Sequence, residues 1–438
     1  MKQLRTWQAS VRRKPLLLEG PRQTGKTWLL KQFGSEAYRD TAYLDLEQSP
    51  TLRAIFDADF DSSRILRQLQ LATGVRVAPA STLIVLDEIQ ACPRALSALK
   101  YLNDNASEYH VACAGSLLGV TLHEQSSFPV GKVNFLSVGP LSFAEFLRAT
   151  GDAPLAEALA GREWELLRPF HARLVGALRD YLFVGGMPEV VATFAESHDF
   201  AAAREVQQEI LRAYDHDFSK HAPSDQVPRI RAVWQSIPKQ LAREQRRFAY
   251  GQLGPGARSR THQAAIEWLT QAGLVHQVDR VTAPRLPLSG YVDPAAFKLY
   301  LADVGLLGAL SGLGAAAVIE GDRMFTEFAG SLTEQYAELA LAAAFGRTYY
   351  WTNGAGTAEV DFVVQRERDV VPVEVKASRN LKAQSLRVYR EKFAPMLAVR
   401  ASLAPYEVRD GLVDLPLYAL SWLSEQGGTA SVRGRSVV

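Results

Sequence analysis

The chain has few cysteines and lacks a long apolar segment. Only two of its 438 residues are cysteine, Cys92 and Cys113, and their spacing fits neither a disulfide framework nor a zinc site. The N-terminus has no apolar stretch of signal-peptide length. The most apolar run, residues 304–321, is interrupted by glycines and falls short of the roughly 20 predominantly apolar residues that a membrane helix needs. These absences argue against secreted and membrane-spanning proteins, and we expect a cytoplasmic one with no membrane partner.

An excess of charge of one sign is also absent. The 49 basic and 47 acidic residues give a formal net charge of +2, and there is no extended charge block of the kind found in disordered tails. The balance neither favours nor excludes a nucleic-acid partner, so any basic surface has to be local. With 47% hydrophobic residues, a chain of this length is expected to fold into several globular domains.

The apolar pattern along the chain predicts a multidomain α/β fold. Between residues 15 and 147, short apolar runs alternate with longer mixed segments, which favours a parallel sheet with crossover helices. Helical spacing dominates residues 161–247. A loop, a helix ending at Gly273 and a strand follow, in the order of a winged helix. The remainder reads as a helix, three strands, a helix and a strand. The predicted domains are a P-loop domain at 1–148, a helical lid at 149–247, a winged helix at 248–312 and an α/β domain at 313–438.

A glycine-rich segment directly follows the first apolar run. Residues 20–27 match the phosphate-binding loop G-x-x-x-x-G-K-[ST], although a glycine turn could also arise by chance. Glycines let the backbone approach phosphates, and successive amides and the helix N-terminus bind the anion. We expect Lys26 to neutralise the outer phosphates and Thr27 to give its hydroxyl to Mg²⁺. The predicted nucleotide-binding residues here are Gly20, Pro21, Arg22, Gln23, Thr24, Gly25, Lys26, Thr27 and Trp28.

An acidic pair follows a second apolar run. Residues 83–86 are apolar and precede Asp87 and Glu88, as in a Walker B element. Asp87 would hold the magnesium shell, and Glu88 would orient and partly deprotonate the attacking water. The alternative is a solvated turn at a strand end.

Further groups could complete the site. A third apolar strand ends at Ser116, which could reach the terminal phosphate or only cap a helix. Phosphoryl transfer also needs an arginine that neutralises the developing charge. Arg22, Arg94 and Arg148 are candidates, and nothing in the local sequence selects one of them.

Motifs spread over nearly the whole chain carry a resemblance. They are GPRQTGKT, LIVLDEIQ, CAGSLLG, FPVGKVNFLSVGPLSFAEFL, YLFVGGMPEVV, KLYLADVGLL, AEVDFVV and VPVEVKAS. As a set they resemble prokaryotic AAA-type ATPases, close to the STAND-like and archaeal ATPases, fused to a C-terminal domain of unknown function with a restriction-endonuclease-like core. The resemblance implies a five-stranded sheet with the phosphate loop on the central strand, and ATP and Mg²⁺ as cofactors. It suggests that Gly186 and Pro188 approach the adenine, although alone they indicate only a helix break.

Carboxylates and a lysine occupy strand-like positions near the C-terminus. Alternation places Glu359 and Asp361 on one face of a strand, and Glu374 and Lys376 on one face of the next. A hairpin would bring Asp361, Glu374 and Lys376 together, giving two carboxylates for Mg²⁺ and a lysine near an attacking water. Spacing alone favours an exposed hairpin face with cross-strand ion pairs. The similarity to the PD-(D/E)xK nuclease pattern favours the nuclease-like fold, and implies Glu334 as a further metal ligand.

Two functions are compatible with these residues. The first is a DNA-directed ATPase whose C-terminal domain binds or cuts DNA, which basic residues near positions 258–262 and 379–390 support modestly. The second is a STAND-like nucleotide-dependent switch that engages a protein partner, with the nuclease-like domain as a non-catalytic binding module. A homo-oligomer is compatible with both.

Overall fold

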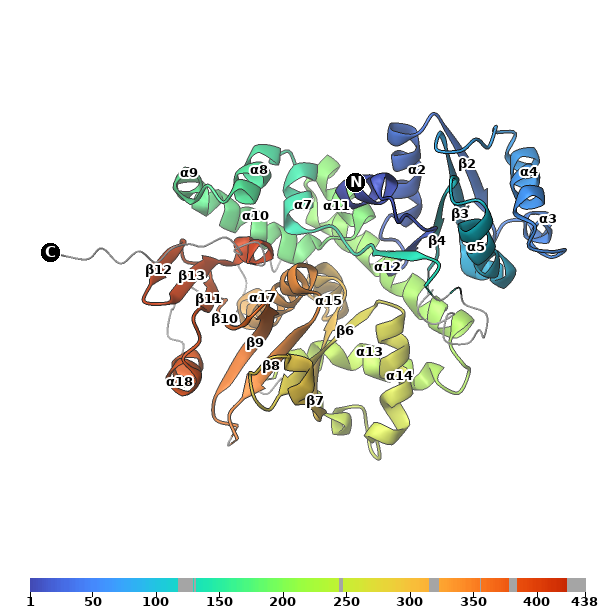
Figure 1. Ribbon diagram of the computed structural model, residues 1–438. Helices are drawn as coiled ribbons and strands as arrows, with labels where there is room; N and C mark the ends of the chain where they lie inside the picture. The colour runs from blue at the N-terminus through green and yellow to red at the C-terminus, as the bar shows by residue number, and fades with distance from the viewer. Residues whose placement is uncertain are drawn as a thin grey trace. The chain divides into compact units, whose positions relative to one another are not determined.

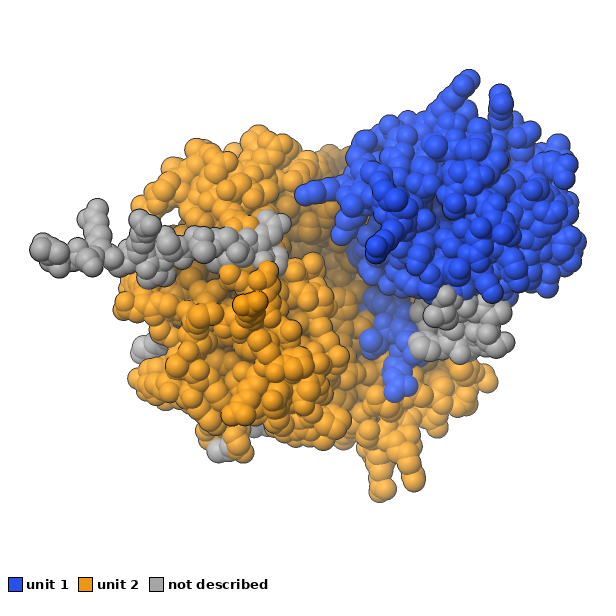
Figure 2. Space-filling model, in the orientation of Figure 1, with its two compact units in different colours: residues 1–139, 267–274 blue, residues 140–266, 275–438 orange. Residues whose placement is uncertain are grey.

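The computed structural model divides into two compact units (Figure 2). Unit 1 consists of Met1–Gly139 and Glu267–Leu274, and unit 2 of Pro140–Ile266 and Val275–Val438. The structure describes residues 1–116, 129, 131–243, 247–314, 323–354, 356–377 and 384–423. Two of the basic residues in the predicted 379–390 cluster, Arg379 and Lys382, lie outside these ranges.

A five-stranded parallel sheet forms the centre of unit 1, which confirms the predicted parallel α/β fold. The strand order is β2-β3-β4-β1-β5. The central strand is therefore β4, and the expectation that the phosphate loop follows the central strand is wrong, because that loop follows β1. The strands are β1 (Leu16–Glu19), β2 (Asp40–Asp45), β3 (Thr82–Asp87), β4 (His110–Ala114) and β5 (Asn134–Ser137).

Both faces of this sheet are covered by helices (Figure 1). Along β3, Ile84 and Leu86 belong to one apolar cluster, and Leu83 and Val85 to the other. A strand that is buried on both faces reads as a continuous apolar run, which is why this strand was visible in the sequence. Helices α4 and α5 contribute to the first cluster, and α1 and α2 to the second. The helices are α1 (Lys2–Ala9), α2 (Lys26–Ala37), α3 (Pro50–Ala54), α4 (Ser62–Thr73) and α5 (Pro93–Asn105), with the 3-10 turn η1 (Ile89–Ala91).

Unit 2 begins with a helical region, in agreement with the helical spacing of its sequence. Its helix α7 starts at a capping box in which Ser142 and Glu145 exchange side-chain and backbone hydrogen bonds. Helix α14 (Ser259–Gln271) starts in unit 2, and its last residues belong to unit 1. The other helices are α7 (Phe143–Ala149), α8 (Ala153–Gly161), α9 (Trp164–Leu167), α10 (His171–Val184), α11 (Pro188–Ser197), α12 (Phe200–His221) and α13 (Val227–Leu241).

An eight-stranded mixed sheet with the order β12-β13-β11-β10-β9-β8-β6-β7 forms the rest of unit 2. The predicted series of a helix, three strands, a helix and a strand is present as α17, β8 to β10, α18 and β11. Strands β8, β9 and β10 pair antiparallel in sequence, and β10 pairs parallel with β11. The elements are β6 (Val275–Val281), β7 (Val292–Leu301), α15 (Val304–Leu310), α17 (Arg323–Phe345), β8 (Thr348–Thr352), β9 (Glu359–Arg366), β10 (Asp369–Val375), α18 (Gln384–Phe393), β11 (Ala398–Ser402), β12 (Glu407–Arg409) and β13 (Leu412–Pro416).

The strand expected after the helix of the predicted winged helix at 248–312 is β6, and it belongs to this same sheet. Strand β6 pairs antiparallel with β7 and parallel with β8, with Arg280 opposite Tyr350. The hairpin therefore extends the C-terminal sheet, and the boundary predicted between residues 312 and 313 separates strands that pair with one another. The local pattern of loop, helix and strand could not reveal this, because the pairing with β8 joins residues far apart in the chain.

Candidate functional site

The segment that connects β1 to α2 forms a tight loop with glycines where side chains would not fit. Gly20 has a φ of 137° and Gly25 a φ of 79°. A Cβ on Gly20 would lie 2.1 Å from the carbonyl oxygen of Val138, so only glycine is compatible with this backbone. The side chain of Thr24 is buried, and its Oγ1 donates to the carbonyls of Pro21 (2.9 Å) and Val138 (3.1 Å). Thr24 therefore holds the loop in place.

Lys26 opens helix α2, and its side chain is buried. Its Nζ donates to the carbonyl oxygens of Gly20 (2.9 Å) and Pro21 (2.5 Å). Burial lowers the pKa of Lys26 to about 8, while the nearby Glu88 and Asp87 act in the opposite direction. The ammonium group thus lies inside the loop and within the field of both predicted acids.

Asp87 ends strand β3 with its side chain buried. Its Oδ2 accepts a hydrogen bond from the hydroxyl of Tyr43 (2.8 Å), and its Oδ1 from the amide of Glu88 (3.1 Å). The parallel register of β2 and β3 sets Asp45 opposite Asp87, which places Tyr43 two residues earlier on the neighbouring strand. Burial and this hydrogen bond raise the pKa of Tyr43. Sequence reasoning missed Tyr43, because its role depends on which strand is the neighbour of β3.

Glu88 is connected to the phosphate loop through Ser116. The hydroxyl of Ser116 donates to Glu88 Oε2 (3.1 Å), and Arg22 Nε donates to Ser116 Oγ (3.0 Å). Gln90 Nε2 also donates to Glu88 Oε2 and to Ser116 Oγ, the latter at 3.3 Å. The Glu88 carboxylate thus accepts from Ser116 and Gln90, and Ser116 links it to Arg22 of the loop. Gln90 was missed in the sequence, although its place two residues after the acidic pair was the available signal.

The remaining predicted nucleotide residues of unit 1 have different environments. Trp28 is 67% exposed, Gln23 is exposed, and Thr27 is half-buried. Of the two candidate arginine fingers other than Arg22, Arg94 donates to the carbonyl of Phe56 (2.8 Å) within unit 1, and Arg148 belongs to unit 2.

The turn that follows α14 lies against the phosphate loop within unit 1. Gly273 has a φ of 72°, and a Cβ added to it would lie 3.2 Å from Cδ of Pro21. A segment about 250 residues away in the chain therefore contacts the loop, which no local motif indicated.

Gly186 and Pro188, predicted near the adenine, have a packing role within unit 2. The amide of Gly186 donates to Asp303 Oδ2 (2.6 Å), and its carbonyl accepts from the amide of Leu141 (2.6 Å). A Cβ on Gly186 would lie 2.1 Å from the carbonyl oxygen of Leu141. Pro188 is the first residue of α11, where a missing amide hydrogen is tolerated. Their contact with a nucleotide stays a prediction.

In unit 2, the β9–β10 hairpin brings Asp361, Glu374 and Lys376 together, as the spacing predicts. Asp361 Oδ2 accepts from the amide of Val375 (2.8 Å), and Glu374 Oε1 accepts from Lys376 Nζ (2.7 Å). Glu374 is buried, and its Oε2 has no hydrogen-bond partner among the described residues. Burial and the neighbouring Asp361 raise the pKa of Glu374 to about 7, against the effect of Lys376.

Glu334, predicted as a further metal ligand, already has buried hydrogen-bond donors. Its buried Oε1 accepts from Lys298 Nζ (3.1 Å) and from the hydroxyl of Tyr300. Lys298 is fully buried and also donates to Glu359 Oε1 (2.6 Å). In the ranges that the structure describes, no group of three or more His, Cys, Asp or Glu side chains could hold a metal ion. A role of Glu334 as a metal ligand stays a prediction, and the ion pair with the buried Lys298 would compete with it.

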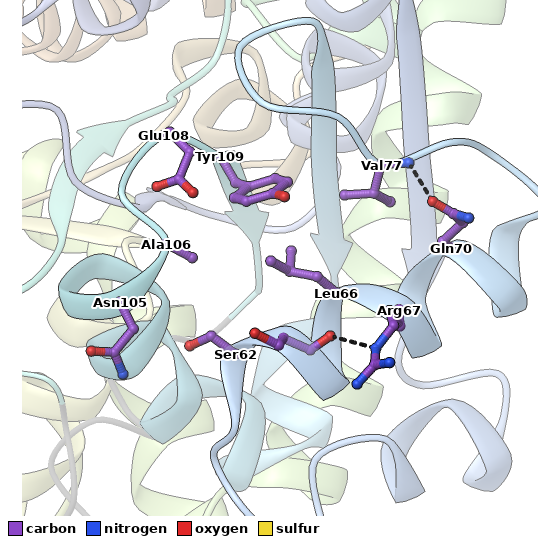
Figure 3. Close-up of a pocket in the computed structure, with 10 residues that line it drawn as sticks. Ser62, Leu66, Arg67, Gln70, Val77, Asn105, Ala106, Glu108 and Tyr109 are labelled. Atoms are coloured by element: carbon purple, nitrogen blue, oxygen red, sulfur yellow. Dashed lines mark hydrogen bonds between the residues drawn. The ribbon is translucent and has the colours of Figure 1, made fainter.

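A separate cavity of about 280 Å³ lies in unit 1 between α4 and the segment that leads into β4 (Figure 3). Within it, Arg67 Nε donates to the carbonyl of Ser63 (3.4 Å) and Gln70 Oε1 accepts from the amide of Val77 (3.2 Å). It contains no predicted site residue. Its lining residues are Ser62, Ser63, Leu66, Arg67, Gln70, Val77, Asn105, Ala106, Glu108 and Tyr109.

Three family models match successive parts of the chain. Residues 12–147 match an AAA domain. This part of the chain is an AAA-type P-loop domain. Residues 175–317 match a domain of unknown function (DUF8612), and residues 329–420 match another (DUF4143). The loop, Lys26, Asp87 and Glu88 all lie within the AAA domain.

Three solved structures with likeness to the chain have TM-scores below 0.5. A Walker-type ATPase of Pyrococcus abyssi has a TM-score of 0.45 and 16% identity, covering 70% of this chain and 94% of its own. The RuvB Holliday junction branch migration motor of Thermotoga maritima has a TM-score of 0.29 and 14% identity, and the match covers 66% of this chain and 88% of that chain. Cdc6p of Pyrobaculum aerophilum has a TM-score of 0.23 and 13% identity, and the match covers 71% of this chain and 89% of that chain. No curated protein sequence matches the chain. Among the described residues, no helix has the length and apolar character needed to cross a membrane.

Proposed function

We propose that the protein binds and hydrolyses ATP at the AAA domain, and that unit 2 binds or cuts DNA. The observation that carries the first part is the position of Lys26, whose buried ammonium lies in the phosphate loop and in the field of Asp87 and Glu88. A lysine in this place can neutralise the outer phosphates of a nucleotide, and the two acids can serve the metal and the water.

The oxygen donors beside the loop suit magnesium. Thr27 offers a hydroxyl and Asp87 a carboxylate, which are hard ligands of the kind that Mg²⁺ binds together with phosphate oxygens and waters. The hydrogen bond from Tyr43 fixes one oxygen of Asp87. Bound there, the ion would neutralise charge on the transferred phosphoryl group.

Glu88 is the general base in this proposal. Water forms a bond to the γ-phosphorus, the bond to the leaving ADP oxygen breaks, and one water proton passes to Glu88. Ser116 and Gln90 hold Glu88 Oε2, so the orientation of this carboxylate is fixed before the reaction. Arg22, bonded to Ser116, is the arginine best placed within the AAA domain to stabilise the developing charge.

The DNA part of the proposal rests on Asp361, Glu374 and Lys376. Two carboxylates on adjacent strands, one with an oxygen that has no hydrogen-bond partner among the described residues, could share a divalent cation, with Lys376 beside an attacking water. One observation favours the alternative of a non-catalytic module in a protein-binding switch. Lys298 already neutralises Glu334 and Glu359, which leaves fewer acids for metal-dependent cleavage.

The test measures ATP hydrolysis and Mg²⁺-dependent cleavage of DNA and RNA in parallel. Wild type is compared with Glu88→Gln and Asp361→Ala, and a gel shift records nucleic-acid binding. We expect Glu88→Gln to lose only ATP turnover. Cleavage that Asp361→Ala abolishes would establish a nuclease. ATP turnover without any nucleic-acid binding would instead support the switch, and a wild type that binds ATP but never hydrolyses it would contradict the ATPase proposal.

A further inference from the structure

The chain turns sharply after Glu88 and brings Gln90 back to it. Glu88 has a left-handed φ of 47°, which is uncommon for a residue other than glycine. The 3-10 turn η1 follows at once, from Ile89 to Ala91. Because of this turn, the side-chain nitrogen Nε2 of Gln90 donates to Glu88 Oε2, the same oxygen that accepts from Ser116. A residue other than glycine adopts this backbone conformation only where the surrounding structure holds it there, and such residues cluster at functional sites.

The other end of the Gln90 amide has no partner. Its Oε1 is buried and accepts no hydrogen bond within the described part of the chain. A buried acceptor without a donor loses the hydrogen bond that it would make with water, and such groups are few in folded proteins. Beside the proposed general base, the Nε2 of Gln90 thus already donates hydrogen bonds, while its Oε1 can still accept one.

We propose that Gln90 is a positioning residue for the attacking water in ATP hydrolysis. Its Nε2 holds the carboxylate of Glu88, and its Oε1 accepts a hydrogen bond from the water. The water has two O–H groups, so one can donate to Gln90 while the other gives its proton to Glu88. The water oxygen then forms the bond to phosphorus, and the bond to the ADP oxygen breaks. This inference rests on the proposed ATPase function and names a second residue that orients the same water.

The test separates turnover from nucleotide binding. We expect Gln90→Ala to lower kcat for ATP by about 100-fold, as is typical when one preorganised hydrogen-bonding group is removed. The dissociation constant for ATP is measured in the presence of Mg²⁺ by calorimetry. It should change less than about twofold, because the link from Gln90 to the predicted phosphate-binding residues is its hydrogen bond to Ser116. Gln90→Glu has nearly the same shape, and it should lose turnover as well because it cannot donate to Glu88. Thermal unfolding of both variants shows whether the fold is kept.

A control and a double variant make the test specific. Gln70→Ala removes a side-chain amide in the same unit that accepts from the amide of Val77 and lies outside the proposed site, and it should leave kcat unchanged. In the background of Glu88→Gln, the change Gln90→Ala should cause little further loss, because the two residues act on one water. A Gln90→Ala variant with wild-type kcat, or a loss of equal size in both backgrounds, would overturn the inference while leaving the ATPase proposal intact. Absence of ATP turnover in the wild type would overturn both.

Discussion

The proposed nucleotide site of the AAA domain and the carboxylate cluster of unit 2 use the same residue types in opposite ways. In the first, Lys26 donates to backbone carbonyls, and the acids are held by uncharged donors, Tyr43 for Asp87 and Ser116 for Glu88. In the second, lysines pair directly with acids, as Lys376 does with Glu374.

This difference bears on what each site can do. Charges held by neutral groups stay available for a phosphate and a metal, whereas charges that already form ion pairs have to break those pairs to bind a ligand. Lys298, with Glu334 and Glu359, is the extreme case, since it is fully buried. The comparison therefore predicts that lysine removal damages stability in unit 2 and turnover in the AAA domain.

The largest expected effect is on the stability of unit 2. Lys298→Met would leave the acids Glu334 and Glu359 without their cation, and we expect the free energy of unfolding to fall by about 3–5 kcal/mol. Denaturant unfolding of the full chain measures this. Lys239 is an exposed lysine of the same unit, so Lys239→Met is the matched control and should change the free energy of unfolding little.

Adding Glu334→Gln to Lys298→Met should recover part of the loss, because one of the unpaired charges is then removed. A loss below about 1 kcal/mol for Lys298→Met would show that the ion pairs of this lysine contribute little. The prediction that removing a lysine destabilises unit 2 would then be wrong.

Lys26→Ala should act on turnover rather than stability. Removing the ammonium from the loop is expected to lower ATP turnover by at least about 100-fold, since it deletes a preorganised positive charge at the phosphates. Lys132→Ala removes an exposed lysine from the same unit, paired with Asp104, and should leave turnover unchanged. Equal rates in the Lys26→Ala variant and the wild type would show that this loop does not serve hydrolysis.

The two sites also differ in how far the sequence could predict them. The phosphate loop was found because its groups lie on consecutive residues, and the acidic pair because β3 is apolar on both faces. Tyr43 was missed because its contact depends on strand order, and the pairing of β6 with the distant β8 was missed because no local pattern indicates it.

In unit 2 the hairpin residues Asp361, Glu374 and Lys376 were predictable from alternation. The ion pair of Glu334 could not be predicted, because its partner Lys298 is 36 residues away on another element. Buried ion pairs between distant segments leave no periodic pattern in a sequence, and they decide which acids stay available.

Acidification should destabilise unit 1 through His110. Burial lowers the pKa of His110 to about 4, and its Nδ1 lies 2.7 Å from the hydroxyl of Tyr38. With an unfolded pKa near 6.5, the unfolded state binds more protons between about pH 6.5 and pH 4, so stability falls as the pH falls through that window. We expect a loss of about 1 kcal/mol for each pH unit below 6.5. His110→Gln, which does not titrate, should flatten the dependence in unfolding curves recorded from pH 7 to 5.

His276 of unit 2 should show the opposite sign. Burial opposes its charge, but the carboxylate of Glu338, 3.0 Å away, prevails and raises the pKa of His276. Its contribution to stability is therefore full below the unfolded pKa and is lost as the pH rises through the folded value. In His276→Gln, the difference in stability from the wild type should be larger at pH 5 than at pH 8. The same difference at both values would show that this pair does not titrate.

The smallest expected effects concern helix caps, which are local features and should be alike in both units. Asp61 caps α4 by accepting from the amide of Ser63 (2.9 Å), and Ser142 caps α7 by accepting from that of Glu145 (3.4 Å). Alanine at either cap should cost about 1 kcal/mol, because an amide at the helix N-terminus loses its acceptor. Ser142→Asp keeps an acceptor and should retain most of the stability. Similar losses in the two units would show that local sequence stabilises both equally, so that the difference between the sites comes from long-range ion pairs.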